Sequence, residues 1–208
     1  MQNLETQRQS AGKLAPMRDA GNLQTWVDEM DAALIARTSM PVPCGSCTAC
    51  CQAAQFIRVE ADDHAARAAI PAELLFPLPS EPGTHLLGYD DQGRCPMLKD
   101  NQCSIYSARP AACQTFDCRI YAATGIATGA DQQKIQQRVD EWQFLDDPRL
   151  QQALKSASAF VRKHRAKLFN GSPPAAQLAL ATLKVHNLFL NEAQPTFTAV
   201  EHHLHGPA

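Results

Sequence analysis

The stretch Cys44-Gly-Ser-Cys47-Thr-Ala-Cys50-Cys51 is the part of the sequence around which the rest of the chain must fold. The remaining cysteines are Cys95, Cys103, Cys113 and Cys118. All eight cysteines of the 208-residue chain therefore lie between residues 44 and 118, and none lies outside this region. Such a concentration indicates that the thiols act together, either as metal ligands or as disulfides.

The spacing Cys-x2-Cys-x2-Cys favours a metal centre, because it brings three sulfur atoms to one side of a tight loop. Gly45 suits this loop, since glycine adopts positive φ at no steric cost and lets backbone N–H groups donate to thiolates. A zinc ribbon usually takes one Cys-x2-Cys pair from each of two distant segments, whereas a triple spacing resembles the start of a bacterial ferredoxin motif. The fourth ferredoxin cysteine is missing here: Cys51 follows Cys50 directly, and Cys95-Pro96 stands far away.

Composition and charge are those of an ordinary soluble protein. The formal net charge of -2 leaves no electrostatic footprint for nucleic acid. Residues 1–25 are polar, and no apolar run in the chain is long enough for a secretory signal or a membrane span. We therefore expect a cytoplasmic protein, and in a reducing compartment clustered cysteines bind metal more often than they form disulfides.

A two-part motif gives the chain a family resemblance. The motif reads Cys44-x2-Cys47-x2-Cys50-Cys51, then Cys95-Pro-x-Leu98, Cys103-x-Ile105-Tyr106-x2-Arg109-Pro110-x2-Cys113 and Phe116. It resembles the bacterial CxxCxxCC (YkgJ-like) family of cysteine-cluster proteins and covers roughly a third of the chain. The resemblance implies a domain that chelates zinc or iron. The same domain type occurs in flagellin lysine N-methylase, where the resemblance implies an iron–sulfur centre.

The second half of the motif can also be explained physically, without the family resemblance. Pro110 pre-sets a helical φ, so Cys113 is predicted near the start of a short helix, where unpaired N–H groups and the helix dipole favour a thiolate. Arg109 could neutralise further sulfur charge or pair with a carboxylate. Tyr106 and Phe116 are predicted to pack over the site and exclude water, although each taken singly is better explained as an ordinary core residue. Arg109 and Tyr106 are the predicted cofactor-contacting residues.

The expected fold is mainly α, with a small irregular cysteine-rich core that contains a short β-hairpin, and with a helical C-terminal region. The predicted organisation is a flexible tail at 1–20, a helix plus the cysteine-cluster domain at 21–122, a helical region packed on it at 131–195, and a second tail at 196–208. Apolar residues spaced by three and four predict the N-terminal helix over residues 22–37.

Short elements are expected between the cysteines. They are a strand over 56–59, a helix over 60–69, a loop over 74–83, a hairpin pairing 86–89 with 94–98, and a turn at 100–102. The hairpin would place Cys95 beside the first cysteines, and the turn would present Cys103.

Three helical segments are expected after a glycine-containing linker at 124–129. The first carries the stripe Ile135, Val139, Trp142 and Leu145. The second begins at Asp147-Pro148, a cap residue followed by proline at the first helical position, and continues to residue 168. The third covers residues 172–191.

Two charged features have plain explanations. The basic residues at 162–167 read as a solvated helix end on a chain of net negative charge. His202, His203 and His205 could chelate a transition metal, but in a predicted tail incidental affinity explains them better than a site does. No phosphate-binding loop, metalloprotease, serine hydrolase or radical-SAM motif occurs, and no catalytic residue is predicted.

Two functions from different classes therefore remain. The first is a non-catalytic metal-binding protein, whose partner is a metal ion or cluster, with an unidentified protein as a further partner. The alternative is a protein-modifying enzyme of the flagellin lysine methylase type, or a small redox protein. The predicted ligands are all the cysteines: Cys44, Cys47, Cys50, Cys51, Cys95, Cys103, Cys113 and Cys118. The triple spacing predicts an iron–sulfur cluster, with zinc as the alternative because eight thiolates could also make two tetrahedral zinc sites.

Overall fold

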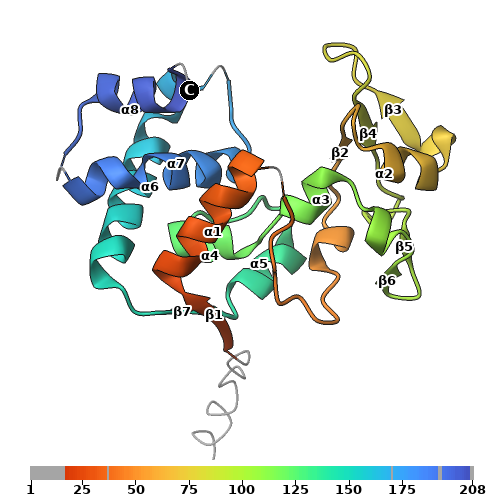
Figure 1. Ribbon diagram of the computed structural model, residues 1–208, viewed down its shortest axis with the longest axis horizontal. Coiled ribbons are helices and arrows are strands. Elements are labelled where there is room, and N and C mark those ends of the chain that lie inside the picture. The colour runs from red at the N-terminus through yellow and green to blue at the C-terminus, as the bar shows by residue number, and fades with distance from the viewer. Residues whose placement is uncertain (1–16, 37, 170, 192–193, 207–208) are drawn as a thin grey trace, which may run out of the picture.

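The computed structural model describes residues 17–36, 38–169, 171–191 and 194–206. Figure 1 shows the helices α6, α7 and α8 on one side, a group of short strands on the other, and α1 and α4 between them. The predicted mainly α fold with small β elements is thereby confirmed. Within the described ranges, no helix combines the length and apolar character needed to cross a membrane.

The N-terminal helix α1 spans Leu23–Ala36 and confirms the predicted amphipathic helix. Its buried face includes Leu23, Trp26 and Met30. Before it lies the strand β1 (Arg18–Asn22), so residues 18–20 form part of a strand instead of a tail. The rest of the predicted tail, up to residue 16, lies outside the described residues.

β1 pairs in parallel with β7 (Trp142–Leu145), which corrects the first of the three helical segments expected after the linker. Helix α5 (Gln133–Val139) ends before Trp142, and the four residues of β7 alternate between buried or half-buried and exposed positions. Trp142 and Leu145 were therefore wrongly placed on a helical stripe. The strand forms because β1, far away in the sequence, offers backbone partners, with Arg18 opposite Trp142.

The segments between the cysteines contain two small antiparallel sheets. The first has the order β2-β4-β3 (Ile57–Val59, His85–Leu87, Leu75–Pro77), and the second pairs β5 with β6 (Leu98–Lys99, Gln102–Cys103). The helices of this region are η1 (Ala49–Gln52), α2 (His64–Ala69), η2 (Ala72–Leu74), η3 (Tyr106–Ala108) and α3 (Ala111–Thr115).

Two expectations for this region are wrong. Residues 94–98 do not pair with 86–89, because β4 takes β2 and β3 as its neighbours, and residues 75–77 of the predicted loop form β3. This pairing buries Leu87 next to Val59 in a small apolar cluster, which a hairpin with the cysteine-containing segment would not provide. The predicted turn itself is present, since Gly93 N donates to Asp90 O at 2.8 Å.

The C-terminal helices follow the sequence pattern closely. α6 (Pro148–Leu168) begins at Asp147, whose carboxylate accepts from Leu150 N at 3.0 Å. α7 (Ala175–Asn191) packs along it. α8 (Phe197–His205) occupies the predicted C-terminal tail, because Val200 is fully buried between its neighbours. His205 Nε2 lies 2.8 Å from Leu168 O and thus takes part in helix packing.

The main core lies where α1, α4 (Arg119–Thr124), α6 and α7 meet. Trp26, Tyr121, Leu154 and Leu183 are among its buried members. Cys50 and Cys118 pack against this core, whereas Cys95 packs against the smaller cluster around Leu87. The cysteines therefore lie at the boundary between two apolar clusters.

Candidate metal centre

The first four cysteines lie on a tight turn followed by one turn of 3₁₀ helix. Gly45 has φ +57°, as its place between ligands predicts, and Cys47 N donates to Cys44 O at 3.0 Å. η1 then carries Cys50 and Cys51, with Cys51 N donating to Thr48 O at 3.0 Å. The local backbone therefore folds this segment, here called the hook (residues 44–51), into a compact unit.

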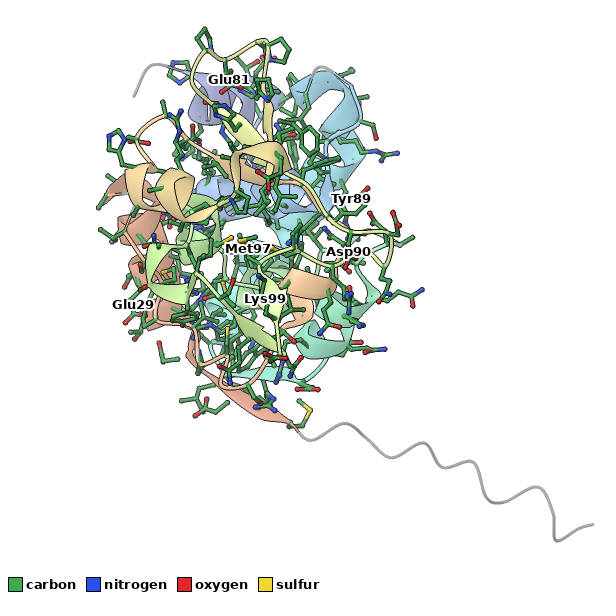
Figure 2. All side chains as sticks on the ribbon, turned by 90° about the vertical axis from the view of Figure 1, so that its right-hand side faces the viewer. Glu29, Glu81, Tyr89, Asp90, Met97 and Lys99 are labelled. Atoms are coloured by element: carbon green, nitrogen blue, oxygen red, sulfur yellow. The ribbon has the colours of Figure 1, made fainter. Side chains whose placement is uncertain are left out.

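Cys95 and Cys103 belong to a later segment of the chain, which folds back toward the hook. Cys95 N donates to Cys51 O at 2.8 Å, so the prediction that Cys95 lies beside the hook is confirmed even though the predicted hairpin is not. Cys103 lies on the β5–β6 hairpin, opposite Leu98. Its turn uses the predicted residues Asp100 and Asn101, both at positive φ. In Figure 2, Met97 and Lys99 lie near the middle of this face, with sulfur atoms gathered beside Met97.

Cys113 lies in the first turn of α3, as predicted. Pro110 stands just before the helix, and the Asp63 carboxylate caps it by accepting from Ala111 N at 2.9 Å. Cys118 immediately precedes α4. The two helices thus deliver two further sulfur atoms from a segment that follows the hairpin directly.

The environment of the thiols divides them into two groups. All eight are free and half-buried. Burial raises the pKa of Cys118 to about 12, and the neighbouring thiols Cys44 and Cys47 add to the rise. We call these three the first thiol group.

The second thiol group is Cys95, Cys103 and Cys113. Burial raises the pKa of Cys113 to about 12, and Cys50, Cys95 and Cys103 act in the same direction. Burial raises the pKa of Cys95 as well, again with Cys103 and Cys50 beside it. Because its thiol also contributes to the rise of the Cys44 pKa to about 11, for which burial is the main cause, Cys50 stands between the two groups.

Two side chains outside the cysteine segments donate N–H groups to sulfur. Arg138 Nε donates to Cys47 Sγ at 3.2 Å, and Trp142 Nε1 donates to Cys118 Sγ at 3.2 Å. Sequence reasoning missed both roles. No spacing signal links Arg138 to the cysteines, and Trp142 was read as an apolar helix residue.

Arg109 and Tyr106, the predicted cofactor-contacting residues, contact each other. The Arg109 guanidinium lies 3.8 Å from the centre of the Tyr106 ring. Tyr106 is 65% exposed, so the expectation that it packs over the site and excludes water is wrong. Phe116 does pack, against the main core. Arg109 Nε is buried without a hydrogen-bond partner among the described residues, and its charge opposes the pKa rise at Cys113.

The donor set fits a thiolate-bound metal in its chemistry. Eight soft sulfur ligands and the N–H groups of Arg138 and Trp142 that donate to sulfur suit a centre with negative sulfur charge. The Arg109 N–H, which has no partner among the described residues, suits it as well. Among the described residues, however, no three His, Cys, Asp or Glu side chains are arranged to hold a metal ion as they stand. The sulfur atoms of the described cysteines therefore lie near one another without converging on a single point.

The comparison with protein families agrees with this chemistry. Residues 43–141 match the model of the CxxCxxCC family, which is described as a "Putative zinc- or iron-chelating domain". The chain thus contains a CxxCxxCC domain, as its cysteine motif predicts, and metal binding is the general function that this match supports. The matched segment ends just before Trp142. No match was found among the curated proteins or the solved structures.

Proposed function

We propose that this protein binds an iron–sulfur cluster through cysteine thiolates and serves as a metal-binding protein without catalytic residues of its own. The proposed ligands are drawn from Cys44, Cys47, Cys50, Cys51, Cys95, Cys103, Cys113 and Cys118. The observation that carries the proposal is the approach of these thiols from the hook, the β5–β6 hairpin, α3 and the residue before α4 to one half-buried region. When bound, such a cluster would supply electron-transfer or sensing chemistry.

The hook supports a cluster over a lone zinc ion. Its triple spacing matches the way in which ferredoxin-type segments surround a cluster, with a remote cysteine as the last ligand. Adjacent cysteines such as Cys50 and Cys51 rarely serve one small ion. Here the two thiols lie within hydrogen-bond reach of each other, which together with burial raises the pKa of Cys50 above its usual range. Zinc remains the second candidate, because the two thiol groups, with Cys50 and Cys51 between them, could be completed as two tetrahedral sites.

Anaerobic purification tests the proposal. The wild-type protein is expected to contain iron and acid-labile sulfide and to show a broad visible absorption. Cys47→Ser should lose most of both, whereas Ser46→Ala, an exposed change in the same turn, should keep them. Colourless wild-type protein with stoichiometric zinc and no sulfide would replace the cluster by the zinc alternative. Protein that holds neither metal after anaerobic purification would overturn metal binding itself.

A further inference from the structure

The first thiol group receives its N–H donors from outside the hook. Arg138 belongs to α5 and Trp142 to β7, and they donate to Cys47 and Cys118 at 3.2 Å each. An N–H group that donates to a thiolate disperses its charge and fixes the direction of the sulfur atom. The two donors therefore act on two different sulfur atoms of one group.

Arg138 is held in place by a second contact. Its side chain is only 13% exposed, and Nη1 donates to Glu141 Oε2 at 2.8 Å. The same carboxylate oxygen accepts from Arg18 Nε at 2.7 Å. Glu141 thus aligns Arg138 toward Cys47 and ties it to β1.

Trp142 is held by the strand pairing. Arg18 N donates to Glu141 O at 2.6 Å, and β1 then continues alongside β7 from Arg18 opposite Trp142. The indole is largely buried, at 7% exposure, so its N–H has little access to water as an alternative partner. The pairing of two strands distant in sequence therefore determines where the Trp142 N–H points.

The second thiol group is supported differently. Cys95 receives backbone donors from Met97 and Leu98 on its own loop. The nearby cation Arg109 has a buried Nε that finds no hydrogen-bond partner in the described part of the chain. The two groups therefore differ in the source of their support: distant side chains for the first, local backbone for the second.

We propose that Arg138 and Trp142 are positioning residues of the metal centre, whose N–H groups stabilise the Cys47 and Cys118 thiolates and strengthen metal binding at the first thiol group. This inference rests on the proposed binding of metal by thiolates but does not depend on which metal is bound in the cell. Arg138, inside the CxxCxxCC match, and Trp142, the first residue after it, thereby become part of the site.

Co²⁺ is a suitable probe, because thiolate-to-cobalt charge-transfer absorption reports on the sulfur ligands themselves. The reduced, metal-free full-length chain would be titrated anaerobically with Co²⁺ as wild type, Trp142→Phe and Arg138→Gln. Trp142→Phe keeps an aromatic ring and removes only the N–H donor. Arg94→Gln is the matched control: it removes an exposed cation next to Cys95 that pairs with Asp90 and donates to no sulfur among the described contacts.

Each of the two donor variants is expected to bind Co²⁺ about 10-fold more weakly than wild type. Their charge-transfer bands should move to lower energy, because a sulfur atom that loses an N–H donor gives up electron density more readily. Arg94→Gln should change neither quantity. A purely structural role would weaken binding without moving the band.

The outcomes separate the two levels of the proposal. Wild-type affinity and band position in both donor variants would overturn the inference and leave thiolate metal binding intact. A wild-type chain that binds no Co²⁺ would overturn the proposed function and the inference together. Far-UV circular dichroism confirms folding, and if Arg138→Gln does not fold, Trp142→Phe alone decides.

Discussion

The C-terminal helices and the cysteine region between residues 44 and 118 are stabilised in different ways. α6 and α7 pack against each other and bury apolar side chains such as Val161 and Val185 completely. The cysteine region has strands of two or three residues and one small apolar cluster around Val59 and Leu87. Eight half-buried thiols lie where a larger core would otherwise be expected.

This difference indicates that the helical region depends on apolar burial and the cysteine region on bound metal. Apolar burial contributes about 25 cal/mol per Å². Long helices packed on one another therefore bury enough apolar surface to be stable, whereas short strands joined by turns bury too little. Metal binding then supplies folding free energy to the cysteine region. The predictions below test this comparison, from the largest expected effect to the smallest.

Removal of metal should produce the largest effect, and it should be confined to the cysteine region. Structural zinc contributes about 10–16 kcal/mol in small domains that fold around it, so its loss can unfold a region with little core. Limited proteolysis with mass-spectrometric mapping, before and after chelation, should show cleavage between residues 44 and 118 while α6 and α7 stay protected. Equal protection of both regions with and without metal would contradict this prediction.

Asp117→Ala should destabilise both regions, because this carboxylate joins them. Its side chain is fully buried, pairs with Arg119 at 2.7 Å and accepts from Trp26 Nε1 at 2.8 Å. Removing one partner of such a pair leaves a buried charge and costs about 3–5 kcal/mol. Urea denaturation measures the loss.

The control for Asp117→Ala is Arg94→Gln, which breaks an exposed ion pair with Asp90. A pair of this kind contributes less than about 1 kcal/mol. Similar losses of unfolding free energy in the two variants would argue against a structural role for the buried Asp117 pair.

Val161→Ala should weaken the helical region alone. Val161 is fully buried in the cluster shared by α6, α7 and α8, and removing two methyl groups with a residual cavity costs about 2 kcal/mol. Thermal unfolding should show the loss, while metal content stays at the wild-type level. Lys155→Ala, an exposed change on the same helix, should have almost no effect. Loss of metal in Val161→Ala would show that the two regions are not independent.

The smallest effect concerns Asp31 on α1. Burial raises the pKa of its carboxyl group above the usual range, an effect that His186 opposes and Asp28 supports. Because the pKa is higher in the folded protein than in the unfolded chain, stability is fully present below the unfolded pKa and is lost as pH rises through the folded pKa. At neutral pH the charged carboxylate therefore destabilises the fold.

Asp31→Asn should consequently raise the unfolding free energy by about 0.5 kcal/mol at neutral pH. The gain should shrink as the pH falls toward about 4, where the wild-type carboxyl group becomes protonated. Urea midpoints at about pH 7 and about pH 4.5 measure this difference. Glu29→Gln, an exposed change on the same helix, is the control. A gain that grows toward low pH would reverse the assigned sign.

Local patterns in the sequence were enough to predict the long helices and part of the site. The apolar spacing of α1, α6 and α7 and the Asp147 cap are properties of neighbouring residues, so they can be read without tertiary contacts. Pro110 likewise predicted Cys113 in a short helix. Cys95 does lie beside the hook, but that prediction rested on a hairpin that does not form.

Other features depended on contacts between residues far apart in the chain. β4 pairs with β2 and β3 because this pairing buries Leu87. The sequence of 86–89 and 94–98, two apolar segments joined by a turn, does not show which strands pair. α8 formed in a polar-looking segment because the other helices offered Val200 a buried position.

The sequence by itself determined that all eight cysteines belong to one region of the chain and that four of them share one tight turn, since the spacing of the hook is a local property. Only the tertiary structure decided which side chains support them. Trp142 donates to Cys118 because β7 pairs with β1, and Arg138 reaches Cys47 while Glu141 and Arg18 hold it. These contacts join residues separated by as many as 123 positions, and side-chain direction at such a distance is fixed by packing, not by sequence periodicity.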